Sequence, residues 1–214
     1  MVKVLPAILE KDFASVKRAW RRWEKITDWA QIDVVDGKFA SNKTFNDIEK
    51  LSKIKSKLKI EVHLMVKEPR QQIADWVKLP AVKRVIFHLE TTTEPMELIQ
   101  LIHRAGRQAG AAINPETRVA KLKPLMSKLE IIQVMGIKPG RQGRVFKLDT
   151  LKKIKTIRRL KKDVLISVDG GVNAENAPKI ITAGADILVS GSYLKKSNNP
   201  KMAMKQLLQS AKRR

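Results

Sequence analysis

The chain has 214 residues, contains no cysteine and is 43% hydrophobic, which excludes a disordered chain, a disulfide scaffold, a thiolate zinc site and a cysteine nucleophile. Lys and Arg total 44 against 21 Asp and Glu, so the formal net charge is +23. The basic residues are spread along the chain, with denser groups at 17–22, 152–162 and 212–214. We therefore expect solvated surfaces that attract small anions and no specific nucleic-acid partner.

No segment has the roughly 18 consecutive apolar residues that a membrane-spanning helix needs. The apolar stretch at the N-terminus is short and lacks the small-residue cleavage site of a signal peptide. The sequence therefore predicts a cytoplasmic protein with no membrane partner.

Short apolar runs alternate with amphipathic stretches along the whole chain. In the first half, the predicted strand and helix of each pair are 4–9 and 12–23, 29–35 and 45–54, 59–66 and 69–77, and 84–89 and 95–105. In the second half they are 109–113 and 119–129, 131–137 and 148–160, 164–168 and 174–183, and 187–190 and 200–211. The strands are rich in Val and Ile, which is typical of a parallel sheet buried on both faces.

Eight strand–helix units are the number found in a (β/α)8 TIM barrel of the α/β class, and the length suits one domain over residues 1–214. The alternative is a doubly wound open sheet. Such a sheet usually has fewer strands and a glycine-rich first turn, whereas the first turn here, at 7–12, contains no glycine. We therefore predict a single-domain barrel.

Polar residues stand at the carboxyl ends of several predicted strands, where the active site of a barrel is built. Gln31 and Asp33 are two residues apart on one strand and so point to the same side. His63 lies on the next strand, and Asp169 follows the seventh. Each alone would be interpreted as a loop anchor, but buried carboxylates from two sides of one mouth are costly unless compensated. The four residues predict one divalent metal ion.

Glycine-rich turns follow the last three predicted strands. Gly170 and Gly171 follow the seventh strand, Gly191 and Ser192 follow the eighth, and the loop after the sixth contains 140–144, GRQGR. Glycine lets backbone N–H groups approach an oxyanion closely, and the turns after strands seven and eight form the usual phosphate site of a barrel. The sequence therefore predicts phosphate binding there. His88, Glu90 and the helical His103 are expected to have structural or surface roles only.

Several of these residues lie in motifs that together resemble one family. The motifs are PAIL at Pro6–Leu9, IDVVDGKF at Ile32–Phe39, EVHLM at Glu61–Met65, FHLE at Phe87–Glu90, NP at Asn114–Pro115, PGRQG at Pro139–Gly143, SVDGGV at Ser167–Val172 and VSGS at Val189–Ser192. In this order and spacing they resemble the ribulose-phosphate 3-epimerase family. The resemblance implies a (β/α)8 barrel that interconverts D-ribulose 5-phosphate and D-xylulose 5-phosphate, binds a divalent zinc, iron, manganese or magnesium ion, and forms homo-oligomers.

The resemblance also implies roles for particular residues. Asp33 and Asp169 match the two carboxylates that remove and deliver the proton at carbon 3 through an enediolate, and each also binds the metal. His63 matches a metal-binding histidine that also contacts substrate. The remaining substrate-binding matches are Met65, Met135, Gly140, Arg141, Gln142, Gly143, Gly170, Gly171, Gly191 and Ser192.

The chain departs from the family pattern at several of these positions. Gln31 replaces a histidine ligand, which predicts weaker metal binding because an amide oxygen is a poorer ligand than imidazole for the softer ions. Ala7 replaces a serine, Val35 replaces a methionine, and the phosphate loop carries Lys138 and Arg141. Two alternatives therefore stay open. One is a catalytically weakened or non-catalytic phosphosugar-binding protein, and the other is an epimerase for a different ketose phosphate.

Overall fold

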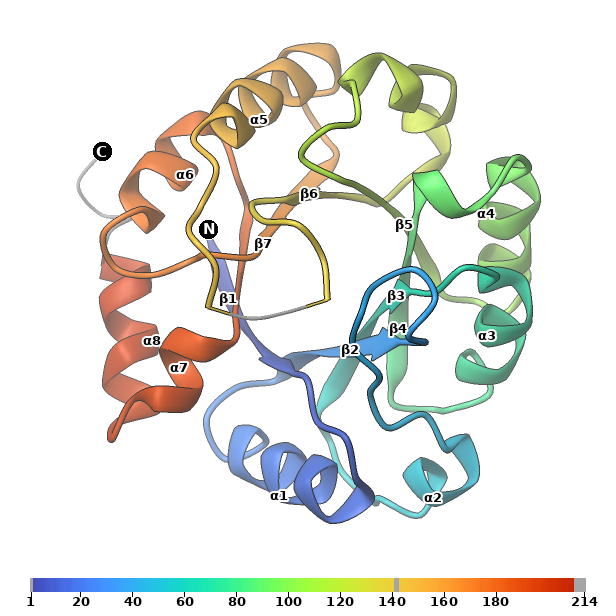
Figure 1. The fold of residues 1–214 in the computed structure, drawn as a ribbon, viewed down its shortest axis with the longest axis vertical. Coiled ribbons are helices and arrows are strands. Elements are labelled where there is room, and N and C mark those ends of the chain that lie inside the picture. The colour runs from blue at the N-terminus through green and yellow to red at the C-terminus, as the bar shows by residue number, and fades with distance from the viewer. Residues whose placement is uncertain (1, 141–142, 210–214) are drawn as a thin grey trace.

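The computed structural model describes residues 2–140 and 143–209, and its parallel strands hydrogen-bond in chain order and close into a barrel. The strands are β1 (Lys3–Ile8), β2 (Trp29–Val35), β3 (Lys59–Met65), β4 (Val82–His88), β5 (Gln108–Ile113), β6 (Ile131–Met135), β7 (Leu165–Asp169) and β8 (Ile187–Ser190). Closure comes from β1, which pairs with both β2 and β8 (Figure 1). The predicted (β/α)8 TIM barrel is confirmed.

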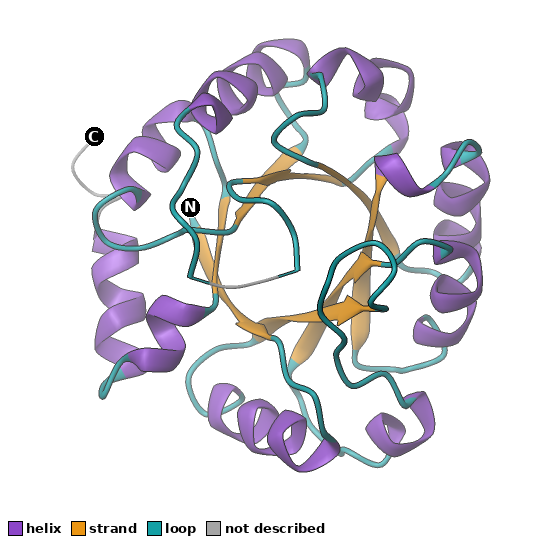
Figure 2. Cartoon of the chain, in the orientation of Figure 1, coloured by secondary structure: helices purple, strands orange, loops and turns teal. Residues whose placement is uncertain are grey.

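Helices surround the ring of strands on all sides in Figure 2. They are α1 (Phe13–Trp23), α2 (Ile48–Ser52), α3 (Pro69–Trp76), α4 (Pro95–Arg104), α5 (Asp149–Leu160), α6 (Ala177–Ala183), α7 (Ser192–Lys196) and α8 (Pro200–Gln209), with 3-10 helices η1 (Leu89–Thr91) and η2 (Val119–Lys128). Local signals set their ends: Asp12 caps α1 by accepting the Ser15 N–H at 2.8 Å, and Gly184 ends α6 in the left-handed conformation. Within the described ranges, no helix is long and apolar enough to cross a membrane.

Several predicted helices differ from those observed. The predicted α-helix at 119–129 is the 3-10 helix η2, because Pro124 in its middle has no backbone N–H to donate. The helix predicted at 45–54 is only Ile48–Ser52, since Asp47 caps it by accepting the Lys50 N–H at 3.0 Å. The short α7 after β8 was not predicted. The last two residues of the helix predicted at 200–211 lie outside the described residues.

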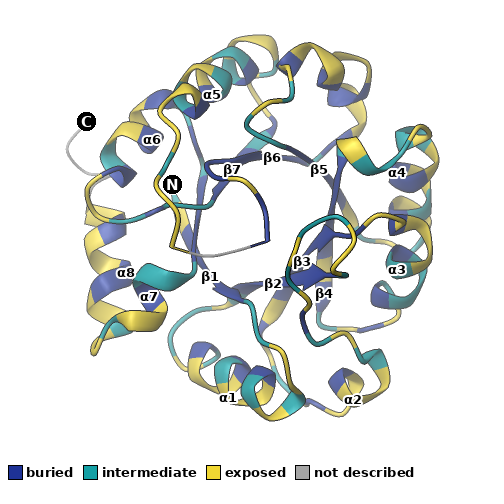
Figure 3. Ribbon diagram, in the orientation of Figure 1, coloured by how far each residue is buried: buried dark blue, intermediate teal, exposed yellow. Residues whose placement is uncertain are grey.

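The core has two separate parts. The larger part lies between the strands and the helices and includes Trp20 of α1 and Trp76 of α3, both almost completely buried. Figure 3 shows the buried strands in dark blue and the exposed outer helix faces in yellow. Burying each large side chain contributes about 1.5–3 kcal/mol. The smaller part fills the barrel itself, and its buried members are Leu5, Ala7, Ile86, Ala112, Ile131, Ile187 and Val189.

A buried ion pair lies inside the barrel, one inward-facing layer before His63. Glu61 on β3 and Arg84 on β4 face each other in the parallel register, and an Arg84 nitrogen donates to Glu61 Oε2 at 2.5 Å. Arg84 also donates to Gln108 and lies 5.0 Å from the Trp29 ring centre. We call Glu61 and Arg84 the inner pair. Beyond it, the polar side chains at the carboxyl ends of the strands form the site described next.

Candidate active site

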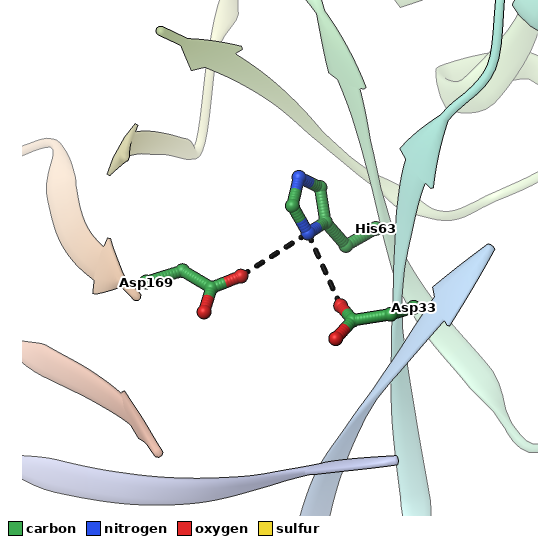
Figure 4. A group of neighbouring side chains, drawn as sticks. All are labelled: Asp33, His63 and Asp169. Atoms are coloured by element: carbon green, nitrogen blue, oxygen red, sulfur yellow. Dashed lines mark hydrogen bonds and ion pairs between the residues drawn. The ribbon is translucent and has the colours of Figure 1, made fainter. Parts of the chain in front are cut away.

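Three side chains from separate strands meet at the carboxyl end of the barrel. Asp33 lies on β2, His63 lies level with it on β3, and Asp169 is the last residue of β7. His63 Nδ1 lies 3.2 Å from Asp33 Oδ1 and 3.2 Å from Asp169 Oδ2. Figure 4 shows the two carboxylates pointing toward the same imidazole from two sides. The fold therefore brings together three residues that are far apart in the sequence.

Burial and close charges shift the pKa values of this cluster. Burial alone would lower the pKa of His63, but hydrogen bonds and charges from Asp169 and Asp33 outweigh it and raise the pKa to about 9. Burial raises the pKa of Asp33, and the nearby Asp169 charge acts in the same direction, against the opposing contacts from His63 and Gln31. Without a bound cation, His63 is therefore positively charged at neutral pH and compensates the carboxylates.

Two buried amides also contact the carboxylates. Gln31 Nε2 donates to Asp33 Oδ1 at 2.7 Å and to Asp169 Oδ2 at 2.9 Å, and it lies 3.4 Å from His63 Nδ1. Gln133 on β6, which the sequence analysis did not select, donates to Asp169 Oδ2 at 3.3 Å. The amide oxygen of Gln31 is buried and has no hydrogen-bond partner among the described residues. Gln31 thus faces the cluster with its nitrogen, and as a metal ligand it would need to rotate its amide and present that oxygen.

The donor set of this cluster fits a divalent metal ion. One ligand atom from each of Asp33, His63 and Asp169 lies within 4.8 Å of the others, and all three residues are buried. Two carboxylates and one imidazole are ligands common to zinc, iron and manganese, and the carboxylates also suit magnesium. After rotation of its amide, the unpaired Gln31 oxygen would be a candidate fourth donor. These residues could therefore bind a metal ion, whose identity the donor set leaves open.

A pocket opens directly above the cluster, and most of the predicted substrate-binding residues line it. They are Met65, Met135, Gly140, Gly143, Gly170, Gly171, Gly191 and Ser192, together with Asp33 and Asp169. Arg141 and Gln142 lie outside the described residues. Exposed Arg144 donates to the Lys138 carbonyl at 3.4 Å, a contact within its own loop. The pocket therefore has carboxylates at its base and glycine-rich turns on one side.

The backbone at Gly170 and Gly171 requires glycine. Both residues have positive φ angles, 98° and 72°, which side-chain-bearing residues rarely adopt. A Cβ atom on Gly171 would also lie 3.0 Å from the backbone nitrogen of Phe146. The turn after β7 can thus pass close to the loop after β6, and the two together shape one side of the pocket.

Comparison with known proteins agrees with this architecture. The sequence profile of the Ribulose-phosphate 3 epimerase family matches residues 3–195. The chain is 37% identical to the protein named ribulose-phosphate 3-epimerase in Bacillus subtilis, over 97% of this chain and 98% of that protein. The chain belongs to the ribulose-phosphate 3-epimerase family. The corresponding protein of Chlamydia muridarum is 34% identical, over 97% of this chain and 94% of its own length.

Solved structures resemble the fold of this family member at much lower sequence identity. The 3-keto-L-gulonate-6-phosphate decarboxylase of Vibrio cholerae superimposes with a TM-score of 0.75 at 9% sequence identity. The match covers 99% of this chain and 98% of that chain. At this identity, the likeness shows the barrel fold alone.

Two positions that depart from the family pattern are buried at the carboxyl end of the barrel. Ala7 packs into the small apolar cluster inside the barrel and lies level with Gln31 in the sheet register. Val35 is also buried, and its backbone N–H donates to the Thr44 hydroxyl at 2.9 Å. The Thr44 hydroxyl donates in turn to the Asp33 carbonyl at 2.9 Å. Thr44, which the sequence analysis did not select, thereby holds the end of β2 in place beneath Asp33.

His88 and Glu90 have a closer relation to the site than the sequence analysis expected. His88 Nε2 lies 2.9 Å from His63 Nε2, on the side of the imidazole opposite the carboxylates. His88 Nδ1 lies 3.2 Å from Glu90 Oε2. A signal for this contact was present, because FHLE ends the strand next to that of His63. His103, in contrast, is exposed and pairs with Glu130, which confirms its predicted surface position.

Proposed function

We propose that the chain interconverts D-ribulose 5-phosphate and D-xylulose 5-phosphate by inverting carbon 3. The observation that carries this proposal is the convergence of Asp33 and Asp169 on one pocket, from two different strands of a barrel of this family. Inversion through a planar enediolate requires one group that removes a proton from one face and another that returns a proton to the opposite face. Two carboxyl groups in one pocket supply such a pair.

The electrostatics of the pair support different protonation states for its members. Burial and the charge of Asp169 raise the pKa of Asp33, since two carboxylates in one buried site do not ionise independently. One carboxyl group is thereby favoured to hold a proton while the other is ionised. After each inversion the two groups have exchanged these states, and proton exchange with solvent restores them for the next turnover in the same direction.

We propose that Asp33, His63 and Asp169 hold one divalent ion, with Gln31 as the candidate fourth ligand. A zinc, iron, manganese or magnesium ion bound there would polarise the carbonyl oxygen at carbon 2 and stabilise the negative charge that develops on it. His63 would bind through Nδ1, the nitrogen that faces both carboxylates.

The pocket walls support a phosphorylated ketose as the substrate. Met65 and Met135 line the pocket next to the carboxylates, where they would cover the reacting carbons and exclude water. Gly170, Gly171, Gly191 and Ser192 lie after β7 and β8, the usual place for phosphate in a barrel. Gly140 and Gly143 border the same pocket, and Arg141 and Gln142 are proposed to complete the phosphate loop.

Exchange of the carbon 3 hydrogen with solvent tests the proposal directly. Protein loaded separately with each of the four metals is incubated with either ketopentose 5-phosphate in deuterium oxide, and deuterium at carbon 3 is followed by NMR. The proposal expects exchange and inversion with both epimers, and it fails if neither occurs with any metal. Asp33→Asn and Asp169→Asn should each lower the rate of inversion about 10²- to 10⁴-fold while retaining exchange with one epimer only, a different epimer for each variant. Asp149→Asn, at an exposed carboxylate that does not line the pocket, is the matched control for loss of one charge.

The same samples separate the alternatives. A non-catalytic binding protein would bind the sugar phosphates without exchange and without stoichiometric metal in elemental analysis, and an epimerase for another ketose phosphate would prefer a different member of a substrate panel. Homo-oligomer formation and a cytoplasmic location stay predictions, as does the lack of a specific nucleic-acid partner.

A further inference from the structure

A line of hydrogen bonds leads from His63 away from the pocket to a carboxylate in the next loop. His63 Nε2 lies 2.9 Å from His88 Nε2, and His88 Nδ1 lies 3.2 Å from Glu90 Oε2. Both histidine side chains are fully buried. The other oxygen of Glu90 accepts the Asn114 N–H at 2.9 Å and the hydroxyl of Thr117. The line is therefore anchored in the loop after β5.

The positions of the protons fix which atom donates in each hydrogen bond of this line. Burial opposes ionisation of Glu90, but hydrogen bonds from His88, Thr117 and Asn114 hold its pKa at about 2, so Glu90 only accepts. His88 must then carry its proton on Nδ1. With its proton on Nδ1 directed at Glu90, the neutral His88 ring presents Nε2 to His63 as an acceptor. The 2.9 Å contact between the two Nε2 atoms therefore requires the proton to be on His63.

We propose that His88 and Glu90 are positioning residues, which keep a proton on His63 Nε2 and thereby reserve Nδ1 for a divalent ion held with Asp33 and Asp169. This inference rests on the proposed metal site. A ligating imidazole usually donates its other N–H to an outer partner, and that partner fixes both the tautomer and the ring orientation. In this chain the outer partner is a second imidazole, that of His88. The carboxylate of Glu90, the next member of the hydrogen-bonded line, determines which nitrogen of His88 carries the proton.

Ring contacts hold the middle member of the line in place. The His88 and His63 rings are inclined by only 27° with centroids 5.0 Å apart, and the centroid of the Phe39 ring lies 4.7 Å from that of His88. These contacts restrict rotation of the His88 ring and keep its Nδ1 directed at Glu90.

The chain also contains a matched control pair. Glu130 accepts a backbone N–H, from Ala109 at 2.7 Å, and contacts a histidine, His103 Nε2 at 3.0 Å, as Glu90 does with Asn114 and His88. Both side chains of that pair are exposed, and among the described residues no hydrogen bond or ion pair joins them to Asp33, His63 or Asp169. Glu130→Gln thus makes the same chemical change as Glu90→Gln in a pair that leads to no ligand.

The variant Glu90→Gln tests the direction of the line. Its amide still accepts the Asn114 N–H but can donate to His88 Nδ1, which moves the His88 proton to Nε2 and the His63 proton to Nδ1. We expect Co²⁺ affinity, measured by competition with a chelator, to fall about 10- to 100-fold. Glu90→Asp, which keeps the carboxylate, should recover part of the loss, and Glu130→Gln should bind Co²⁺ as the unaltered chain does.

Nitrogen-15 histidine spectra of the metal-free protein provide a second readout that needs no metal. His88 should show the Nδ1–H tautomer in the unaltered chain and in Glu130→Gln, and a different tautomer in Glu90→Gln. Unchanged Co²⁺ affinity in Glu90→Gln, or an Nε2–H tautomer of His88 in the unaltered chain, would overturn the inference. A different result would contradict the proposed metal site itself: no Co²⁺ binding by the unaltered chain, or equal Co²⁺ affinity in Asp33→Asn. Failure of the inference and failure of the metal site are therefore distinguishable.

Discussion

The barrel contains two buried charged clusters in adjacent layers, and they differ in charge balance. In the inner pair, Glu61 meets Arg84 at 2.5 Å, one acid against one permanent cation. In the cluster proposed to bind metal, here called the metal cluster, Asp33 and Asp169 share the single histidine His63 at 3.2 Å each. The inner pair is complete within the chain, whereas the metal cluster has one more acidic group than basic groups.

This difference predicts a structural role for the inner pair and a functional role for the metal cluster. The inner pair needs no further ion, so we expect its loss to lower stability. In the metal cluster, contacts with Asp169 and Asp33 outweigh burial and raise the pKa of His63 to about 9. Burial, together with the Asp169 charge, raises the pKa of Asp33. We expect such a site to exchange protons for a divalent cation. Burial is similar in both clusters, so charge balance rather than burial is the basis for this prediction.

The largest expected effect is on catalysis. Asp33→Asn or Asp169→Asn should lower kcat about 10²- to 10⁴-fold, because each variant removes one of the two proton-transfer groups. The melting temperature of the metal-free protein should change little, since one of two like charges is removed. Steady-state kinetics and thermal unfolding of the same samples check both parts. A variant that loses stability but keeps kcat would reverse the assignment of the two clusters.

The opposite outcome is expected for the inner pair. Glu61→Gln leaves the guanidinium of Arg84 buried without its partner, and this should lower the free energy of unfolding by about 3–5 kcal/mol. Urea unfolding measures this change. Replacing both residues, with Glu61→Leu and Arg84→Met, should restore much of the loss because no unpaired charge is left. If the double variant is as unstable as Glu61→Gln, charge imbalance is not the cause.

Metal affinity should depend on pH through His63. Its pKa is about 9 in the metal-free protein, so at neutral pH an incoming ion displaces one proton. Apparent affinity should rise about tenfold per pH unit from pH 7 and level off near pH 9. The same proton stabilises the metal-free fold. That contribution is complete below pH 6.5 and is lost as pH rises through 9. Chelator competition from pH 6 to about pH 9 measures the metal affinity, with His103→Gln as the control. A metal affinity that does not change with pH would exclude His63 Nδ1 as the ligand.

The smallest expected effect concerns Gln31. Gln31→His should tighten metal binding several-fold, because imidazole is a better ligand than an amide oxygen for zinc and iron. Gln31→Leu decides between two roles of the present residue. If the amide oxygen ligates, metal binding weakens in Gln31→Leu. If the amide nitrogen only occupies the place next to Asp33 and Asp169, removing it strengthens metal binding, and Gln31 is then not a ligand.

The periodic pattern of the chain was enough to predict the fold. Continuous apolar runs rich in Val and Ile separated by amphipathic stretches specify strands buried on both faces and helices buried on one, and only a few arrangements satisfy eight such units. The helix predicted at 119–129 was wrong because Pro124 removes a backbone donor, an effect on one hydrogen bond that the apolar spacing does not reveal.

The site was predictable only where a residue ends a strand or matches a family motif. Asp33, His63 and Asp169 could be selected in this way because a barrel places strand ends at one mouth. The direction of the Gln31 amide, the contact of Gln133 with Asp169 and the line from Glu90 to His63 could not. Hydrogen-bond direction and charge balance depend on distances across strands that are not adjacent in sequence, and these distances exist only once the barrel has closed.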